Sequence, residues 1–393
     1  MWIKVSDITH PFGRDCSATF PFIVLPTDLE RSLGQVETPI RLFSLTAIPY
    51  TRAMQETKTQ QSKAQANRVP VSLVTGFLGS GKTTLLNHLV SQPGMESTAL
   101  VINEFGEVGL DHLLVESAIE NTLLLENGCI CCSIRGDLVD TLLDLFRKAD
   151  SGEIPRFDRI LIETTGIADP VPIVRTLDSD PAAADRCRLD LVVTLVDGVQ
   201  GLRQISDHDE VVAQVAVADI ILVSKSDLVD ETDTQRLRDA LAGINPAAGI
   251  RSISRGEVDP DSLFAEGASR DATASDNGPG HTHNHTDAHR HGEISTCSIV
   301  HGPALDPERL RAWLRMIVSL RPHALLRIKG YAHVRGMDEP LLLQAVGPVV
   351  SPPETIDSWP DDRPETRLVL IFKGLEPASI SESFRRFVVD TGS

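Results

Sequence analysis

The chain has 393 residues and a formal net charge of −18, with 55 acidic against 37 basic side chains. This charge repels polyphosphate backbones and anionic lipid surfaces, so we expect no nucleic acid or membrane partner. No run approaches the roughly eighteen consecutive apolar residues of a membrane helix, and the start lacks the pattern of a secretory signal. We therefore expect a cytoplasmic protein. Its length and 41% hydrophobic content suffice for two cores.

The first folded unit is predicted from alternating strand and helix patterns. Residues 1–66 show no sustained periodicity, and we expect a poorly ordered extension there. Residues 67–255 carry helical spacing at Asp137–Lys148 and Asp233–Leu241, between short Val/Ile/Leu runs typical of strands buried on both faces. The runs are Val71–Val74, Ala99–Ile102, Arg159–Ile162, Leu189–Val196 and Asp219–Val223. This predicts a P-loop NTPase-like α/β domain with a mostly parallel, doubly wound sheet.

Residues 256–292 are rich in Gly, Asp, Ser and His and poor in large apolar side chains, which predicts an exposed linker. A smaller α+β domain is expected over residues 293–389. Its predicted strands are Ile294–Val300, Ala324–Val334, Leu341–Val350 and Arg367–Phe372. Its predicted helices are Pro307–Leu320 and Ile380–Val389.

A phosphate-binding motif follows the first predicted strand. Residues 76–84 fit the pattern G-x-x-x-x-G-K-[ST] and precede a predicted helix. Backbone N–H groups of such a loop surround phosphate oxygens, the lysine neutralises the β- and γ-phosphates, and the next hydroxyl faces Mg²⁺. A glycine-rich turn without a ligand fits this strand-to-helix context poorly. The residues assigned to nucleotide binding are Gly76, Gly79, Ser80, Gly81, Lys82, Thr83 and Thr84.

A carboxylate ends the strand at Arg159–Ile162. Glu163 is followed by Thr, Thr and Gly166, at the position where P-loop proteins place the acid that supports Mg²⁺ and senses the γ-phosphate. A strand-end acid can also cap the next helix. Because of the P-loop, we assign Glu163, together with Lys82 and Thr83, to catalysis and Gly166 to nucleotide binding.

The base is predicted from Ser224, Lys225 and Asp227, which resemble the Asn-Lys-x-Asp element of GTPases with Ser in place of Asn. The carboxylate of Asp227 can accept hydrogen bonds from the ring N–H and the exocyclic amine of guanine, a donor pair that adenine lacks. We therefore expect GTP as the nucleotide. A polar turn after a strand is the simpler alternative.

Residues 103–111, with two glycines among acidic side chains, directly follow a predicted strand. Such a segment can be ordered by the γ-phosphate and Mg²⁺ and released on hydrolysis, so we interpret it as a switch loop. A solvated surface loop is the alternative.

Three cysteines, Cys129, Cys131 and Cys132, occur within one short segment after a glycine. Free cysteines usually occur singly, whereas clustered thiolates suit Zn²⁺, Co²⁺ or Cu⁺. One cluster leaves the coordination incomplete, and Glu107 in the switch loop is a candidate further ligand. The alternatives are a redox pair, since Cys129 and Cys132 have Cys-x-x-Cys spacing, and inert packing.

A second group of metal-binding residue types lies in the predicted linker. Neutral imidazole is a good ligand for Zn²⁺, Co²⁺ and Ni²⁺, so a His-rich loop can capture these ions weakly. A soluble spacer is the alternative. The histidines are His281, His283, His285, His289 and His291.

Together these motifs resemble the CobW-like family of P-loop GTPases, which includes zinc-regulated GTPase metalloprotein activators. The resemblance rests on the P-loop, Asn-Glu-Phe-Gly-Glu at 103–107, Gly-Cys-Ile-Cys-Cys at 128–132 and Glu-Thr-Thr-Gly at 163–166, and it covers roughly residues 68 to 389. It implies a GTP-hydrolysing metallochaperone that binds zinc, or cobalt, at Cys129, Cys131 and Cys132 and transfers it to a client metalloprotein.

Three other functions stay open at this point. The chain could be a cobalt chaperone in cobalamin biosynthesis, a P-loop kinase for a small molecule with structural cysteines, or a metal buffer with a vestigial P-loop. The sequence also leaves open which metal is used in the cell and whether the chain forms a homo-oligomer.

Overall fold

The computed structural model describes residues 68–103, 122–124, 130–134, 138–268, 294–320, 323–356, 358–360 and 363–390. All of them belong to one compact unit of the chain. The predicted extension 1–66 lies outside these residues, as do the predicted histidine ligands and most of the predicted switch loop. No helix in the described part is long and apolar enough to span a bilayer.

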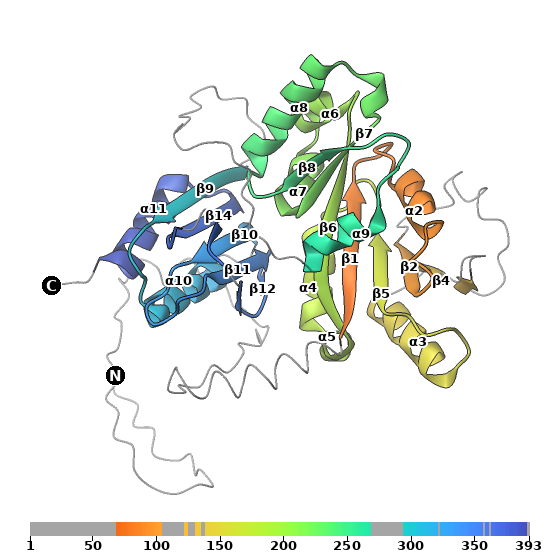
Figure 1. Ribbon diagram of the computed structural model, residues 1–393, viewed down its shortest axis with the longest axis horizontal. Helices are drawn as coiled ribbons and strands as arrows, with labels where there is room; N and C mark the ends of the chain where they lie inside the picture. Colours follow the sequence, from red (N-terminus) through yellow and green to blue (C-terminus); the bar gives the residue numbers. More distant parts are fainter. Residues whose placement is uncertain are drawn as a thin grey trace, which may run out of the picture. The chain divides into compact units, whose positions relative to one another are not determined.

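The first domain is built on an eight-stranded sheet with the order β3-β4-β2-β5-β1-β6-β7-β8 (Figure 1). All neighbouring strands are parallel except β3 and β4, which confirms the predicted mostly parallel sheet. The strands are β1 (Val69–Gly76), β2 (Thr98–Asn103), β3 (Thr122–Leu124), β4 (Ile130–Ile134), β5 (Arg159–Glu163), β6 (Cys187–Asp197), β7 (Ile220–Ser224) and β8 (Gly249–Ser252).

Alternating residues of the central strands pack into cores on the two faces of this sheet. In β5, Ile160 and Ile162 belong to one apolar cluster and Leu161 belongs to another. Residues of successive positions in a strand point to opposite faces, so both faces need helices to cover them. The helices are α2 (Lys82–Val90), α3 (Leu138–Ser151), α4 (Pro170–Ser179), α5 (Pro181–Arg186), α6 (Gly201–Asp207), α7 (Asp209–Val217) and α8 (Glu231–Ile244).

One further helix, α9 (Pro260–Ala268), lies where the sequence predicted an exposed linker beginning at residue 256. Leu263 and Phe264 are buried in the same cluster as residues of α2, and the guanidinium of Arg159 stacks on the ring of Phe264 at 3.9 Å. The prediction is wrong for these residues because a single short apolar pair, inside polar sequence, suffices to dock this nine-residue helix. Residues 269–293 lie outside the described part.

The second domain is an antiparallel sheet with the order β12-β11-β10-β14-β9, and β13 pairs with β11. Residues of α10 and α11 share a core with one face of this sheet, which confirms the predicted α+β class. The elements are β9 (Ile294–His301), α10 (Pro307–Leu320), β10 (Leu325–Ala332), β11 (Leu341–Val346), β12 (Val349–Val350), β13 (Glu354–Thr355), β14 (Thr366–Lys373) and α11 (Pro377–Phe384).

Two predicted elements of this domain differ from the structure. The strand expected over 341–350 is interrupted at Gly347, whose φ of 55° reverses the chain between β11 and β12. The helix expected over 380–389 starts three residues earlier, at Pro377, and ends as α-helix at Phe384, followed by a π-helical turn over Arg385–Val389.

The two sheets are joined by a buried ionic contact. The Arg327 side chain, on β10, is 2% exposed and pairs with the carboxylate of Asp219, directly before β7. The second oxygen of Asp219 accepts a hydrogen bond from the backbone N–H of Val192 at 3.0 Å. Lys329 lies 3.6 Å from the same carboxylate, and burial lowers the pKa of its ammonium group. Leu326 and Val217, one and two residues from this pair in the chain, belong to an apolar cluster that contains residues of both domains.

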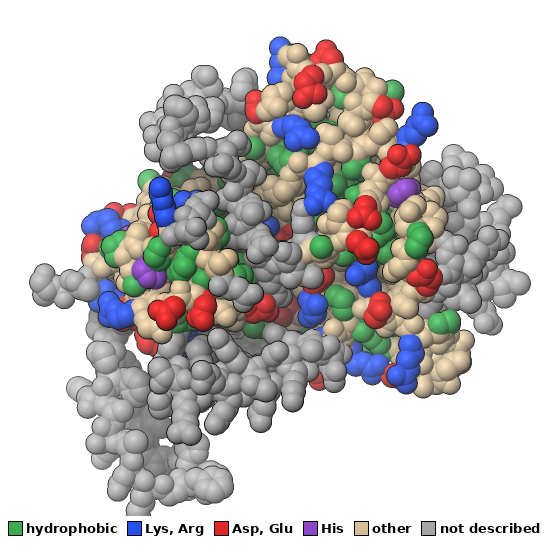
Figure 2. All heavy atoms as spheres, viewed as in Figure 1, with side chains coloured by type: hydrophobic (Ala, Val, Ile, Leu, Met, Phe, Trp, Pro, Cys, Tyr) green, Lys and Arg blue, Asp and Glu red, His purple; other side chains and the backbone are tan. Residues whose placement is uncertain are grey.

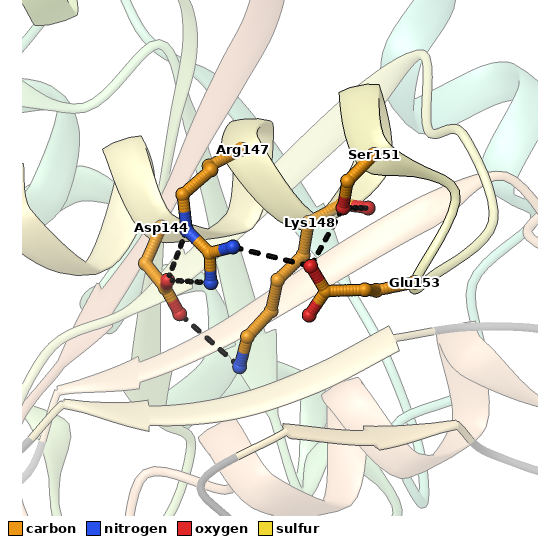
Figure 3. Close-up of polar contacts among 5 residues, drawn as sticks. All are labelled: Asp144, Arg147, Lys148, Ser151 and Glu153. Carbon is orange, nitrogen blue, oxygen red and sulfur yellow. Dashed lines mark hydrogen bonds and ion pairs between the residues drawn. The ribbon is translucent and has the colours of Figure 1, made fainter.

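On the outer surface, charges of both signs are interspersed over the face shown in Figure 2. One group of them lies along α3, where Arg147 contacts Asp144 at 2.8 Å and Glu153 at 3.1 Å (Figure 3). Lys148 also pairs with Asp144, and the hydrogen bond from Arg147 lowers the pKa of that carboxyl. Exposed pairs of this kind contribute little to stability because water screens them.

Replacement of Asp219 by Ala is expected to lower the free energy of unfolding by about 3–5 kcal/mol, because it leaves the buried guanidinium of Arg327 without its carboxylate. Urea unfolding would measure this loss. The control is Arg203→Ala, which removes an exposed i,i+4 pair with Asp207 and should cost less than about 1 kcal/mol. Equal losses in the two variants would contradict a structural role for the buried pair.

Candidate nucleotide-binding site

The residues predicted to bind the nucleotide follow three parallel strands, and a fourth strand lies between two of them. β1 leads into the P-loop at Gly76, β5 ends at Glu163, and β7 ends at Ser224. β6, between β1 and β7, ends at Asp197. The carboxyl ends of parallel strands meet at one edge of a sheet, which is where ligands bind in open α/β sheets. The structure therefore brings together segments that lie up to about 150 residues apart in the chain.

The P-loop turn is set by glycines with positive φ angles. Gly76, Gly79 and Gly81 have φ of 143°, 75° and 97°. A Cβ at Gly76 would lie 2.4 Å from the carbonyl oxygen of Leu195, so no other residue fits between β1 and β6 there. Gly81 is the N-cap of α2, and no side chain caps this helix. The first N–H groups of α2 and the positive end of its dipole are therefore available to an anion.

Lys82 is 8% exposed, and its ammonium group folds back onto the loop. It donates hydrogen bonds to the carbonyl oxygens of Gly76 at 2.7 Å and Phe77 at 3.2 Å. Burial lowers the pKa of Lys82, and the nearby carboxylate of Glu163 partly offsets this effect. The phosphate oxygens of a nucleotide would add negative charge beside this buried cation and stabilise its charged form.

Glu163 is 9% exposed at the end of β5, and the following residue is tied to β1. The backbone N–H of Thr164 bonds to Val74 at 3.0 Å, and its hydroxyl bonds to the hydroxyl of Thr75 at 2.8 Å. Thr83 is exposed in the first turn of α2. A carboxylate and a hydroxyl are the hard oxygen donors that Mg²⁺ requires, so the residues present fit this ion.

Ser224 connects the base-recognition segment to the P-loop. Its hydroxyl donates to the carbonyl oxygen of Ser80 at 2.7 Å, and its side chain is buried. A serine can therefore join these two segments where other GTPases have asparagine. The hydroxyl of Ser80 is itself buried and has no hydrogen-bond partner among the described residues.

Asp227 lies in a short 3₁₀ turn, Ser226–Leu228, after Lys225 in left-handed conformation with φ of 54°. One carboxylate oxygen of Asp227 accepts a hydrogen bond from the hydroxyl of Ser254 at 2.8 Å. The side chain remains exposed, so its second oxygen can face a base.

Sequence reasoning missed two residues of this site, Ser254 and Asp197. Ser254 follows β8, and Gly256, two residues later, packs so closely on α2 that a Cβ would lie 2.9 Å from the backbone of Thr84. Asp197 accepts from the ammonium of Lys225 at 2.6 Å and from the backbone N–H of Val199 at 2.8 Å. An acid followed by glycine at the end of a buried strand was a usable signal for Asp197. Ser254 offered none.

The predicted metal motif is described only in part. Cys131 and Cys132 lie on β4, paired in register with Leu100 and Val101 of β2. Cys129 and Glu107 lie outside the described residues, as do residues 104–111 of the predicted switch loop. The assignment of these residues to a metal site stays a prediction.

Comparison with known proteins decides the family. Residues 70–251 match the family described as "CobW/HypB/UreG, nucleotide-binding domain", and residues 294–388 match "Cobalamin synthesis protein cobW C-terminal domain". The chain belongs to the CobW family of P-loop GTPases. The two matches fall on the two sheets described above.

Relatives of the CobW family extend over most of the chain. The zinc chaperone YjiA of Escherichia coli (strain K12) is 34% identical over 319 residues, which cover 81% of this chain and 98% of YjiA. The zinc chaperone CobW of Pseudomonas aeruginosa is 32% identical, with coverage of 81% and 91%. The crystal structure of Zn(II)-bound YjiA GTPase superposes with a TM-score of 0.66 at 32% identity, covering 82% of this chain and 99% of that one.

Replacement of Asp227 by Asn is expected to weaken GTP binding by at least about tenfold, because an amide presents a donor where guanine also has donors. The same variant should gain affinity for xanthosine triphosphate, whose base has a carbonyl oxygen in place of the exocyclic amine. Competition with a fluorescent nucleotide would measure both affinities. An unchanged ratio of the two would contradict the assignment of Asp227 to base recognition.

Proposed function

We propose that this CobW-family GTPase binds a zinc ion with Cys129, Cys131 and Cys132, assisted by Glu107, and transfers it to a client metalloprotein under the control of GTP. The family relationship supports this function, because relatives that span most of the chain are named zinc chaperones. Cobalt is the competing cargo, since Co²⁺ also accepts tetrahedral sulfur ligands. Reduced thiols require a reducing compartment, so we place the protein in the cytoplasm.

The observation that carries the proposal is the register of three adjacent strands. Ile102 of β2 pairs with Glu163 of β5 on one side and with Ser133 of β4 on the other. Glu163, Ile102 and Ser133 therefore lie side by side on the three strands, and Cys132 directly precedes Ser133. Adjacent strands are about 4.8 Å apart, so the backbones of Glu163 and Ser133 are separated by roughly 10 Å.

The predicted switch loop follows directly from β2, which ends at Asn103. β2 is thus the strand between the predicted catalytic carboxylate and the predicted zinc ligands. A change of conformation beyond Asn103 would move Glu107 relative to both. In the proposed cycle, GTP orders this loop and completes the zinc site, and hydrolysis removes Glu107 and loosens the ion.

The residues of the nucleotide site have separate tasks in this mechanism. The P-loop N–H groups and Lys82 hold the β- and γ-phosphates, and Asp227 with Ser224 and Lys225 selects guanine. Thr83 and Glu163 would hold Mg²⁺, which neutralises charge on the phosphates when bound. Gly166 lies against the backbone of Leu78 in the P-loop, where a Cβ would be 2.7 Å from the Leu78 nitrogen. This contact supports its assignment to nucleotide binding.

The test is steady-state GTP hydrolysis with and without Zn²⁺, by the wild-type protein and by the double variant Cys131→Ser/Cys132→Ser. We expect Zn²⁺ to change the rate of the wild-type protein and not that of the double variant, because only thiolates hold the ion tightly.

The matched control is Cys297→Ser, which changes a buried thiol of the second domain that bonds to Ser381 at 3.1 Å. This variant should keep the zinc response. Wild-type turnover that is indifferent to Zn²⁺, or an equal response in all three proteins, would contradict the proposal.

A further inference from the structure

A buried glutamine contacts the loop that follows the predicted catalytic carboxylate. Gln214, in α7, is fully buried. Its side-chain nitrogen donates hydrogen bonds to the carbonyl oxygens of Gly166 and Ala168, each at 3.1 Å. Two accepting carbonyls two residues apart fix the direction of both peptide groups. Both hydrogen bonds from the side-chain nitrogen of Gln214 therefore go to the backbone of the loop and not to its side chains.

This loop is held in place before Ile167, and the side chain of Ile167 is open to solvent. Thr164 is bonded to β1, and Gly166 lies against the backbone of the P-loop. Ile167, between the two carbonyls that Gln214 holds, is 61% exposed. In a trans peptide the N–H points opposite to the preceding C=O, so the N–H of Ile167 points away from α7. Without Gln214, the described structure gives these two carbonyls no other hydrogen-bond donor.

The amide at position 214 is only partly satisfied. The side-chain oxygen of Gln214 is buried and has no hydrogen-bond partner within the described residues. An unsatisfied buried oxygen opposes folding, so what the amide contributes here is the pair of hydrogen bonds that its nitrogen donates to the loop. The helix is held independently at this position, because the backbone carbonyl of Gln214 accepts from the buried hydroxyl of Thr194 at 2.8 Å.

We propose that Gln214 is a positioning residue for GTP hydrolysis. It acts through the Gly166–Ala168 loop, whose peptide groups it orients next to the P-loop, and it touches neither the nucleotide nor the metal. The role belongs to the hydrolysis reaction and does not depend on zinc transfer. It predicts that the side-chain donor matters for turnover and much less for nucleotide affinity, because the P-loop and Asp227 supply most of the binding contacts.

The first variant is Gln214→Met, which keeps the length of the side chain and removes the donor. We expect kcat for GTP to fall by about tenfold, with KM and the affinity for GDP changed by less than about twofold, since small displacements of positioning groups mainly affect the chemical step. Hydrogen exchange at residues 166–169 should accelerate at the same time. All measurements are made without added Zn²⁺, so they do not test the proposed metal transfer.

A second variant, Gln214→Glu, keeps the shape of the side chain and, because a buried carboxyl facing two carbonyl oxygens is protonated, keeps one hydrogen-bond donor. It should retain more kcat than the methionine variant. Wild-type kcat in the folded methionine variant would overturn the proposal, as would a loss expressed only in KM.

The matched control is Asn245→Leu. Asn245 is also fully buried, and its amide donates to the carbonyls of Val215, Ala216 and Ala218 at the end of the same helix. The variant should lower the melting temperature while kcat stays within about twofold of wild type. An equal fall in kcat would show that any weakening of α7 slows hydrolysis, and it would overturn a specific role for Gln214.

Discussion

Hydrogen bonding between parallel strands fixes the level at which each functional segment leaves the sheet. Val74 pairs with Glu163, and Glu163 pairs with Ile102, so the P-loop, the carboxylate and the end of β2 lie at neighbouring positions along one edge. A slip of one residue would turn every side chain of a strand to the other face. The alternation of Ile160, Leu161 and Ile162 between two cores prevents such a slip. The nucleotide site therefore depends on the packing of the sheet.

The same packing connects the nucleotide edge to the second domain. α4 starts directly after the loop that Gln214 holds, and its Val171 is so close to Gly347 that a Cβ there would lie 2.5 Å from a Val171 methyl group. α7, which carries Gln214, also places Ala216 and Val217 in the core shared with the second sheet. Two helices that begin at or bind the loop after Glu163 thus contact the second domain. A shift of the second domain would therefore be transmitted through α4 and α7 to the loop after Glu163.

Much of the fold could be predicted from the sequence because its signals are local. Each predicted strand of the first domain overlaps an observed one, because a short run of Val, Ile and Leu between turn residues is typical of a buried strand. The P-loop could be predicted equally well, because the left-handed conformations at Gly79 and Gly81 and the close packing at Gly76 favour glycine. The helix α9 was missed because Leu263 and Phe264 form too short an apolar group to show a period.

The contacts that refine the site could not be predicted, because they join distant segments. Ser254 reaches Asp227 across 27 residues, and Gln214 reaches Gly166 across 48. A serine and a glutamine in such positions are indistinguishable in sequence from surface residues. The order of β5, β1, β6, β7 and β8 in the sheet brings the segments that carry these side chains together. The assignments of Cys129 and Glu107 rest on sequence, because both lie outside the described residues.

In the proposed cycle, the nucleotide at one edge of the sheet controls metal affinity at the cysteine cluster. The most direct test is the affinity for Zn²⁺ of the protein loaded with a non-hydrolysable GTP analogue and of the protein loaded with GDP, measured by competition with a metal-binding dye. We expect at least about tenfold tighter binding in the GTP-like state, because a nucleotide can shift metal affinity only by its differential effect on the two states. Equal Zn²⁺ affinities in the two states would contradict this cycle.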